Sequence, residues 1–255
     1  MKKKIGLIGY PLSHSFSKKY FTEKFEKENL QDYEYLNFEC NNLDDFPLIL
    51  QQNPELIGLN VTIPYKEKIL KYVDYKDPVV NETGASNTLL INNGKISAYN
   101  TDVYGFKESL LPLLEKQHKK ALILGTGGAS KAIKYVLKEL NIKYISVSRM
   151  PKNTSQISYE QLTENIVLSH LLVINTTPVG SYPDEKKAPA FPYKFITPEH
   201  LFYDLIYNPS QTIFLKKAKE KGAKVSNGLK MLYLQAEKSW KIWQKKSPYN
   251  FKKNC

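Results

Sequence analysis

Lys66 is the residue whose type and position could carry acid–base chemistry. It closes the segment Asn60-Val-Thr-Ile-Pro-Tyr-Lys66, in which an apolar run ends in a tight Pro-Tyr-Lys turn. Hydride transfer at a carbinol carbon requires a group that exchanges a proton with the oxygen while charge develops there. A protonated lysine is suited to donating that proton in the reductive direction. Lys66 is therefore a candidate proton donor, the alternative being an ordinary surface lysine.

A glycine turn in the middle of the chain is typical of a dinucleotide site. The apolar run Ala121–Leu124 enters a turn and then an amphipathic helix, Ser130–Leu140. The turn residues are Gly125, Thr126, Gly127, Gly128 and Ala129. Glycine allows the tight turn and a close approach of the backbone to a pyrophosphate, which the free N–H groups at the helix N-terminus bind. The third glycine of the usual fingerprint is replaced by Ser130, and such a turn also occurs without a ligand.

The end of the next predicted strand bears on the choice of cofactor. An NAD-binding chain carries an acidic residue there for the ribose 2′-hydroxyl. This strand, Tyr144–Ser148, is instead followed by Arg149, the only arginine of the chain, with Lys152 close behind. A guanidinium can stack on adenine and pair with a 2′-phosphate. Ser148, Arg149 and Lys152 therefore favour NADP, the alternative being that Arg149 is a solvated surface residue.

Composition limits the class of protein. The chain has 255 residues, of which 42% are hydrophobic, enough for one or two folded cores. Two cysteines, Cys40 and Cys255, exclude a disulfide scaffold, and no His/Cys/Asp grouping has metal-ligand spacing, so no metal is expected. Short apolar runs predict a cytoplasmic protein that does not enter a membrane. His118, His170 and His200 are expected on the surface or in loops.

The positive charge does not by itself indicate a nucleic-acid partner. The formal net charge is +12, from 37 Lys+Arg against 25 Asp+Glu. Nucleic-acid sites commonly use arginine forks, yet all but one of these cations are lysines, and they are scattered through every segment. We therefore expect a small-molecule substrate and no nucleic acid.

Alternating strands and helices predict an α/β fold of two domains around a cleft. The expected strands are 4–9, 35–40, 57–62, 88–92 and 95–99, then 120–124, 144–148, 171–176, 202–205 and 224–225, and the other expected helices are 17–28, 42–51 and 228–245. The first domain is expected over residues 1–101 and the second, Rossmann-like, over 102–227. The helix within 228–255 is expected to pack back on the first domain, because Trp240 and Trp243 require a partner surface.

Further motifs along the chain resemble one known family, the shikimate dehydrogenases. They are Gly9–Ser17, Asn60–Lys66, Gly84–Thr88, Asn100–Asp102, Gly125–Ala132, Asn175–Gly180, Asp204–Pro209 and Asn227–Ala236. The resemblance covers nearly the whole chain in order. It implies NADP-dependent reduction of 3-dehydroshikimate to shikimate in aromatic amino acid biosynthesis, with Lys66 exchanging the proton and Asp102 orienting Lys66.

The resemblance also assigns binding residues. It implies that Ser15, Ser17 and Tyr207 hold the substrate carboxylate, that Thr62, Asn87 and Gln235 surround the ring hydroxyls, and that Leu205 and Gly228 line the nicotinamide pocket. Three positions depart from the family pattern: Lys18 replaces a proline, Met150 replaces a threonine and Ser181 replaces a methionine. The loss of the threonine removes an expected phosphate contact, while Lys66 and Asp102 are both present.

Two alternatives remain open from the sequence. One is a quinate/shikimate dehydrogenase that uses NAD, which the absence of an acidic residue at the strand end disfavours. The other is a non-catalytic NADP-binding sensor, which the presence of both Lys66 and Asp102 disfavours. The resemblance is compatible with a monomer or a homodimer.

Overall fold

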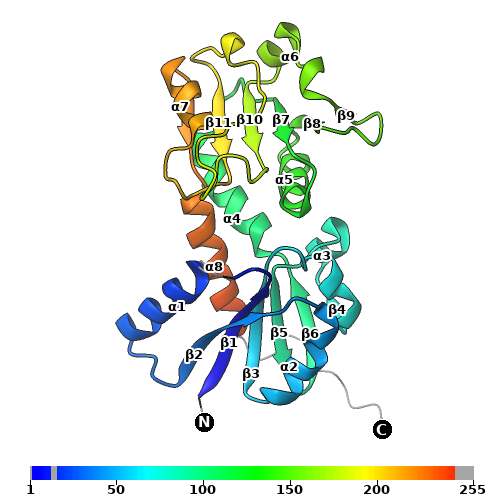
Figure 1. Ribbon diagram of the computed structural model, residues 1–255, viewed down its shortest axis with the longest axis vertical. Helices are drawn as coiled ribbons and strands as arrows, with labels where there is room; N and C mark the ends of the chain where they lie inside the picture. The colour runs from blue at the N-terminus through cyan, green and yellow to red at the C-terminus, as the bar shows by residue number, and fades with distance from the viewer. Residues whose placement is uncertain (1, 13–15, 245–255) are drawn as a thin grey trace. The chain divides into compact units, whose positions relative to one another are not determined.

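The computed structural model describes residues 2–12 and 16–244, and the chain divides into two compact units. The first unit combines Met1–Thr101 with Ala236–Cys255, and the second is Asp102–Gln235. Each unit contains one six-stranded sheet with helices around it, as Figure 1 shows. The mixed α/β class predicted from the sequence is confirmed.

The first unit is built on a mixed sheet. Its strands are β1 (Lys3–Gly9), β2 (Tyr33–Glu39), β3 (Leu56–Val61), β4 (Tyr75–Lys76), β5 (Thr88–Asn92) and β6 (Lys95–Tyr99), in the order β2-β1-β3-β5-β6-β4. β1 is parallel to both β2 and β3, whereas β5 is antiparallel to β3 and β6. A short hairpin joins β5 to β6 through Asn93 and Gly94, which both have positive φ, as a tight hairpin turn requires.

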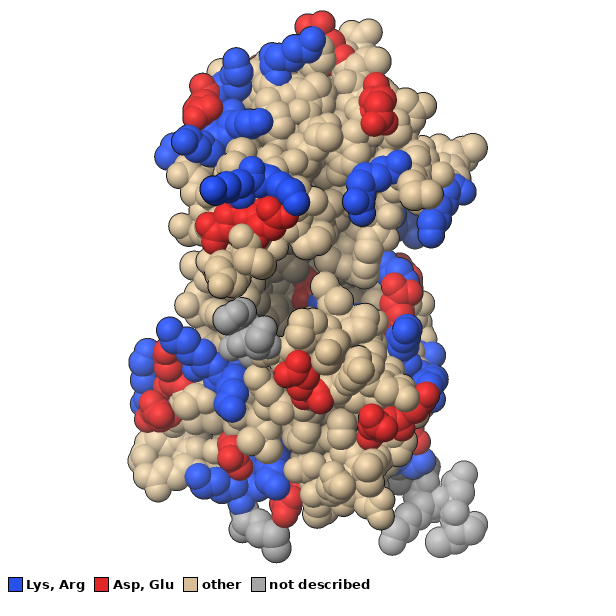
Figure 2. Space-filling model, viewed as in Figure 1, with Lys and Arg blue, Asp and Glu red and all other residues tan. Residues whose placement is uncertain are grey.

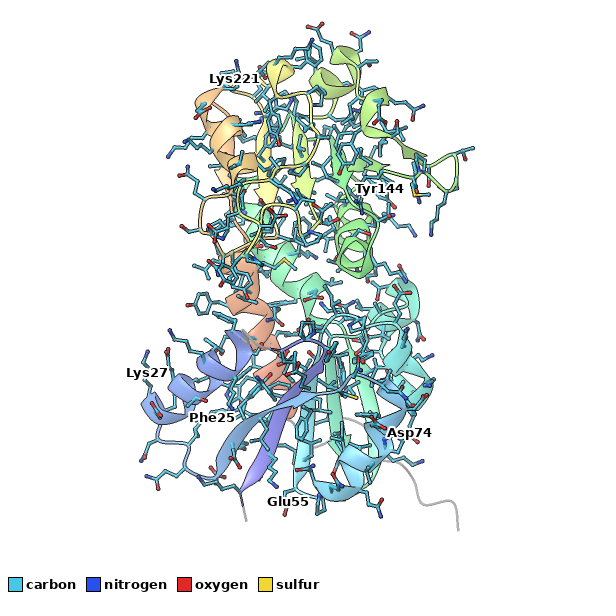
Figure 3. All side chains as sticks on the ribbon, viewed as in Figure 1. Phe25, Lys27, Glu55, Asp74, Tyr144 and Lys221 are labelled. Atoms are coloured by element: carbon cyan, nitrogen blue, oxygen red, sulfur yellow. The ribbon has the colours of Figure 1, made fainter. Side chains whose placement is uncertain are left out.

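Helices cover both faces of this sheet. On one face lie α1 (Phe16–Lys27) and the end of α8 (Leu229–Trp243); on the other lie α2 (Phe46–Gln52) and α3 (Pro78–Thr83). Phe25 points from α1 toward the sheet and packs against Trp240, while Lys27 points away from it (Figure 3). Trp240 and Trp243, in the last turns of α8, are both buried in this unit.

The second unit is built on an all-parallel sheet. Its strands are β7 (Lys120–Leu124), β8 (Lys143–Val147), β9 (Gln156–Ile157), β10 (Leu172–Asn175), β11 (Leu201–Asp204) and β12 (Lys224–Ser226), in the order β12-β11-β10-β7-β8-β9. α6 (Glu164–Ser169) and α7 (Ile213–Glu220) pack on one face. α4 (Thr101–Leu110) packs on the other through Phe106 and Tyr203, and α5 (Gly128–Glu139) follows β7. The order of the strands reverses between β7 and β10: β8 and β9 follow on one side of β7, and β10, β11 and β12 follow on the other. In doubly wound folds, ligands bind where the strand order reverses.

The surface carries both signs of charge. On the face drawn in Figure 2, lysines and acidic side chains alternate over each unit. Several form ion pairs, such as Lys71 with Asp44 at 2.6 Å and Lys95 with Asp74 at 2.7 Å. Within the described residues, no helix is both long and apolar enough to span a membrane.

Candidate active site

Two of the expected substrate-binding residues of the first unit, Thr62 and Asn87, lie at one edge of its sheet. Thr62 follows the end of β3, and Asn87 immediately precedes β5, which is antiparallel to β3. Thr101 follows the end of β6, which is antiparallel to β5 and therefore ends at the same edge. The strand directions thus bring together segments that are up to forty residues apart in the sequence.

The turn after β3 places Lys66 beside this edge. Thr62 N donates to Ile8 O at 3.0 Å, and Tyr65 N donates to Thr62 O at 2.9 Å, which closes the turn. Ser86 N donates to Lys66 O at 2.8 Å, so the backbone of the lysine is tied to the segment that carries Asn87. Thr62 and Lys66 are half-buried, as residues at the rim of a binding site would be.

Asn87 is clasped to the start of α4. Its side-chain oxygen accepts a hydrogen bond from Thr101 N at 2.7 Å, and its Nδ2 donates to Thr101 Oγ1 at 2.9 Å. Asn87 and Thr101 are buried, with 3% and 2% of their surface exposed. The next residue is Asp102, also buried and on the first turn of α4. The clasp therefore fixes the backbone from which the Asp102 side chain projects.

Of the two expected carboxylate-binding serines in the first unit, the structure describes one. Ser17 is on the first turn of α1 and is half-buried. Ser15 lies outside the described residues. The sequence analysis gave no role to Tyr35, a buried residue of β2 whose hydroxyl donates to Asn60 Oδ1 at 2.8 Å.

The glycine turn of the second unit has room for a pyrophosphate. Gly125 has φ of +107°, and a Cβ there would lie 2.7 Å from Thr176 Oγ1, so both conformation and space require glycine. A Cβ on Gly127 or Gly128 would meet no described atom within 4 Å, which leaves open space above the turn. Gly127 is the N-cap of α5, and as a glycine it has no side chain to accept hydrogen bonds from the N–H groups of the first helical turn. Those backbone N–H groups suit an anion, so the residues present fit a dinucleotide.

Arg149 stands at the end of β8, next to the glycine turn that follows β7. The two strands pair in register, with Leu124 opposite Val147. Arg149 is exposed, and its positive charge lowers the pKa of Tyr159, partly offsetting the rise caused by burial of that ring. Lys152 is exposed nearby, and its backbone N–H is held by Gln156 Oε1 at 3.1 Å. Ser148 hydrogen-bonds with the backbone of Met150, which is 78% exposed. Both cations are therefore available to a phosphate.

Three further expected site residues follow β11 and β12, on the other side of the point where the strand order reverses. Leu205 and Tyr207 follow β11, and Gly228 follows β12. A Cβ on Gly228 would lie 2.0 Å from Leu205 O, so any side chain there would force the backbone apart. Tyr207 is half-buried, and burial raises the pKa of its hydroxyl. On α8, Gln235 is buried and donates from Nε2 to Leu232 O at 3.0 Å.

Beneath these loops lies a buried carboxyl group that the sequence analysis did not single out. Asp204 has no exposed surface and accepts hydrogen bonds from Asn175 Nδ2 at 3.0 Å, Ile206 N at 3.1 Å and Thr212 Oγ1 at 2.7 Å. Asn175 Oδ1 in turn accepts from the N–H and hydroxyl of Thr177. This network holds the loops after β10 and β11 together. In the sequence, the residues of this network were indicated only by the two motifs that begin at Asn175 and Asp204.

The three histidines expected on the surface or in loops do lie in loops, but none of them is on the surface. His118, His170 and His200 are buried, with 3%, 7% and 1% of their surface exposed. Each precedes a strand of the parallel sheet, at the end opposite to the glycine turn. Within the described chain, no group of three His, Cys, Asp or Glu residues is placed to hold a metal ion.

Comparisons with known proteins agree with this arrangement. Residues 7–89 match the family described as "Shikimate dehydrogenase substrate binding domain". A shikimate dehydrogenase (NADP(+)) from Methanococcus vannielii is 36% identical, over 94% of this chain and 90% of its own length. The 1.5 Å crystal structure of shikimate dehydrogenase 1 from Peptoclostridium difficile has a TM-score of 0.84 at 36% identity and covers 98% of this chain and 94% of that one.

A third relative was solved with its ligands. The crystal structure of shikimate 5-dehydrogenase from Thermus thermophilus in complex with NADP(H) and shikimate has a TM-score of 0.84 at 29% identity, over 96% of this chain and 94% of that one. The matches extend over both units, not only over the glycine turn that many dinucleotide enzymes share. The chain belongs to the shikimate dehydrogenase family.

Proposed function

We propose that this protein is an NADP-dependent shikimate dehydrogenase, which reversibly reduces 3-dehydroshikimate to shikimate. The observation that carries the proposal is the edge of the first sheet, where Thr62, Lys66 and Asn87 lie on connected segments of a chain that belongs to this family. These are neutral hydrogen-bonding groups and one ammonium, which suit a polyhydroxylated acid with a ketone.

Lys66 gives its proton to the oxygen of the ketone as that oxygen becomes an alkoxide. Asp102 orients the ammonium group, and the clasp between Asn87 and Thr101 fixes the backbone of that carboxylate. In the oxidative direction, the same lysine takes the proton from the carbinol. Asn87, Thr62 and Gln235 hold the ring hydroxyls, while Ser15, Ser17 and Tyr207 hold the carboxylate.

The nicotinamide cofactor, when bound, supplies or accepts the hydride. The backbone of Gly125–Ala129 holds the pyrophosphate, and Ser148, Arg149 and Lys152 meet the adenosine 2′-phosphate. Leu205 and Gly228 line the nicotinamide pocket. The choice of NADP rests on Arg149, because no acidic residue stands in its place to accept a hydrogen bond from a ribose 2′-hydroxyl.

Initial rates of shikimate oxidation with NADP and with NAD, for the wild type and for Lys66→Ala, test the proposal. We expect NADP-linked turnover in the wild type and a fall in kcat of about 100- to 10,000-fold in Lys66→Ala, since proton transfer contributes rate of that order. Lys68→Ala is the matched control, because Lys68 is an exposed lysine two residues away. Its kinetic constants should match those of the wild type.

The same assay separates the alternatives. Turnover of shikimate or quinate that is faster with NAD would overturn the argument from Arg149. Binding of NADP without turnover of shikimate by the wild type would indicate a cofactor-binding protein without this activity. A kcat for Lys66→Ala equal to that of Lys68→Ala would remove Lys66 from the mechanism while leaving the family intact.

A further inference from the structure

Two buried polar residues stand opposite each other at the carboxyl ends of neighbouring strands of the second sheet. Asn175 ends β10 and Asp204 ends β11, and the two strands, side by side in Figure 1, pair in register at these positions. Neither residue has any exposed surface, so water does not compete for their hydrogen bonds. The pair therefore lies at the base of the loops that follow β10 and β11.

The hydrogen bonds of Asn175 fix which way its amide points. Its side-chain oxygen accepts from Thr177 N at 3.0 Å and from Thr177 Oγ1 at 2.7 Å. Because a backbone N–H can only donate, the amide oxygen must face Thr177 and the NH₂ group must face Asp204. Nδ2 then donates to Asp204 Oδ1 at 3.0 Å. Asn175 thus connects the carboxyl group directly to the loop after β10.

The two oxygens of Asp204 hold different parts of the second unit. Oδ1 accepts from Asn175 Nδ2 and, at 3.1 Å, from Ile206 N. Oδ2 accepts at 2.7 Å from Thr212 Oγ1, the N-cap hydroxyl of α7, which in turn accepts from Leu215 N. Both groups that face Oδ1 are N–H donors, so a proton on this carboxyl group can only be carried by Oδ2. Oδ1 therefore accepts hydrogen bonds in either state of ionisation.

The loops held by Oδ1 are those that border the proposed cofactor site. Thr176 Oγ1 donates to Leu124 O at 2.8 Å, and a Cβ on Gly125 would lie 2.7 Å from that hydroxyl oxygen. The loop after β10 is thus packed against the glycine turn. Ile206 O accepts from Gly228 N at 3.0 Å, so the turn after β11 is packed against Gly228.

We propose that Asp204 is a positioning residue of the cofactor site, which acts through Oδ1 by holding the loops after β10 and β11 in the arrangement that binds NADP. Oδ2 serves only the folding of α7. The inference rests on the proposed placement of the cofactor at the glycine turn, Leu205 and Gly228. It predicts that two variants that each deprive the same buried carboxyl group of one hydrogen bond differ in their affinity for NADP.

The test compares Asn175→Leu with Thr212→Val through the Kd of NADPH, measured by titration of its fluorescence. Each variant replaces one donor to Asp204 by an apolar side chain of similar size, so both should have a lowered Tm. We expect Asn175→Leu to bind NADPH about 2- to 10-fold more weakly, the range that the net value of one hydrogen bond allows. Thr212→Val is the matched control and should bind NADPH as the wild type does, although it also loses the N-cap of α7.

Two substitutions of Asp204 itself separate the role of Oδ1 from that of the charge. Asp204→Asn keeps an oxygen that can accept from Asn175 and from Ile206 N, so its Kd for NADPH should match that of the wild type. Asp204→Ala removes this oxygen and should weaken NADPH binding as Asn175→Leu does. A role in folding alone would lower the Tm of these variants without this pattern of affinities.

Two results would overturn the inference. One is an equal affinity for NADPH in Asn175→Leu and Thr212→Val, because the network would then act on the fold alone. The other is a loss of affinity in Asp204→Asn as large as that in Asp204→Ala, because the charge and not the accepting oxygen would then matter.

Failure of this inference can be distinguished from failure of the proposed function. If the wild type binds NADPH but does not turn over shikimate, the proposed function fails, whereas the comparison of the variants still decides the role of Asp204. If the wild type turns over shikimate with NADP and Asn175→Leu keeps the wild-type Kd for NADPH, only the inference is refuted. If the wild type does not bind NADPH, the placement of the cofactor is wrong and the inference fails with it.

Hydrogen exchange in the wild type gives a second measurement, which does not require that any variant folds. Thr177 N and Ile206 N donate to the part of the network that includes Oδ1, whereas Leu215 N is on the side of Oδ2. We expect saturation with NADPH to slow exchange at Thr177 and Ile206 more than at Leu215. An equal effect at all three amides would refute the division of roles between the two oxygens.

Discussion

Asp204 shows how a single buried carboxyl group can make stability depend on pH. Its three hydrogen-bond donors favour the charged form, but burial outweighs them and raises the pKa to about 6. The protonated form is therefore the one that the fold favours. Relative to an unfolded-state pKa near 3.8, this stabilising contribution is present below about pH 4 and is lost as the pH rises through about 6.

The variant Asp204→Asn isolates this effect, because an amide does not titrate. Its oxygen can accept from Asn175 and Ile206 N, and its NH₂ group can donate to Thr212. We expect the wild type to lose up to about 3 kcal/mol relative to the variant between pH 4 and pH 8, from a shift of roughly two pKa units. Urea unfolding of both proteins across this range measures the difference. A difference that stays constant with pH would show that Asp204 is ionised throughout.

At the scale of elements, the amino ends of three adjacent strands carry the buried histidines. His118 Nδ1 accepts from Glu115 N at 2.9 Å, and His200 Nδ1 accepts from Thr197 N at 3.1 Å. Their Nε2 atoms lie 3.2 Å from Glu199 O and Val167 O respectively. Both rings are therefore neutral, with the proton on Nε2, and they connect the loops that lead into β7 and β11.

Acid should destabilise this end of the second sheet. Burial lowers the pKa of His118, His170 and His200, so below about pH 6.5 the unfolded chain binds protons that the folded chain does not. We expect stability to fall as the pH drops from 6.5, by as much as about 1.4 kcal/mol per pH unit for each histidine. The free energy of unfolding therefore rises with pH because of the histidines, whereas it falls with pH because of Asp204.

The double variant His118→Gln and His200→Gln tests this source of acid sensitivity. Glutamine can accept through its amide oxygen and donate through its amide nitrogen, but it does not titrate. Its unfolding free energy, measured from pH 5 to pH 7 beside the wild type, should vary less with pH. If both proteins showed the same slope, other groups would be responsible.

Local pattern predicted the elements better than it predicted contacts between them. The bounds of β5, β6 and β7 agree with the sequence, because apolar runs end there at clear turn signals. The region 42–51, expected as one helix, is a 3₁₀ turn at Leu43–Asp45 followed by α2. The helices α4 and α7 were not anticipated, since α4 starts inside a polar motif and α7 mixes lysines with apolar residues.

In the candidate site too, residues in local motifs could be predicted, whereas residues that act through distant contacts could not. Lys66 and Gly125 could be named because their local motifs determine their backbone. Tyr35 and Ser239 could not be found, since one reads as a core residue of a strand and the other as a polar position on a helix. Both side chains hydrogen-bond with Asn60, across 25 and 179 residues of sequence respectively. Such contacts exist only after the chain has folded.

At the scale of the molecule, the first unit is completed by residues from the far end of the chain. α8 crosses the division between the units after Gln235, and its last turns supply Trp240 and Trp243 to the first core. Trp243 Nε1 donates to Leu89 O at 2.9 Å. Its ring lies against Gly58, where an added Cβ would be 2.2 Å from it. The first sheet therefore cannot reach its native packing until α8 has formed.

Trp243→Ala tests whether each unit has its own stability. We expect a loss of about 3–5 kcal/mol from the cavity and the lost contacts, confined to the first unit. Hydrogen exchange should then rise in β1–β6, while β7–β12 keep their protection, because the described core cluster beneath α6 and α7 contains no residue of α8. Leu229→Ala, at the partly exposed start of the same helix, is the control and should change neither sheet. Equal loss of protection in both sheets would instead show that the chain unfolds as one cooperative unit.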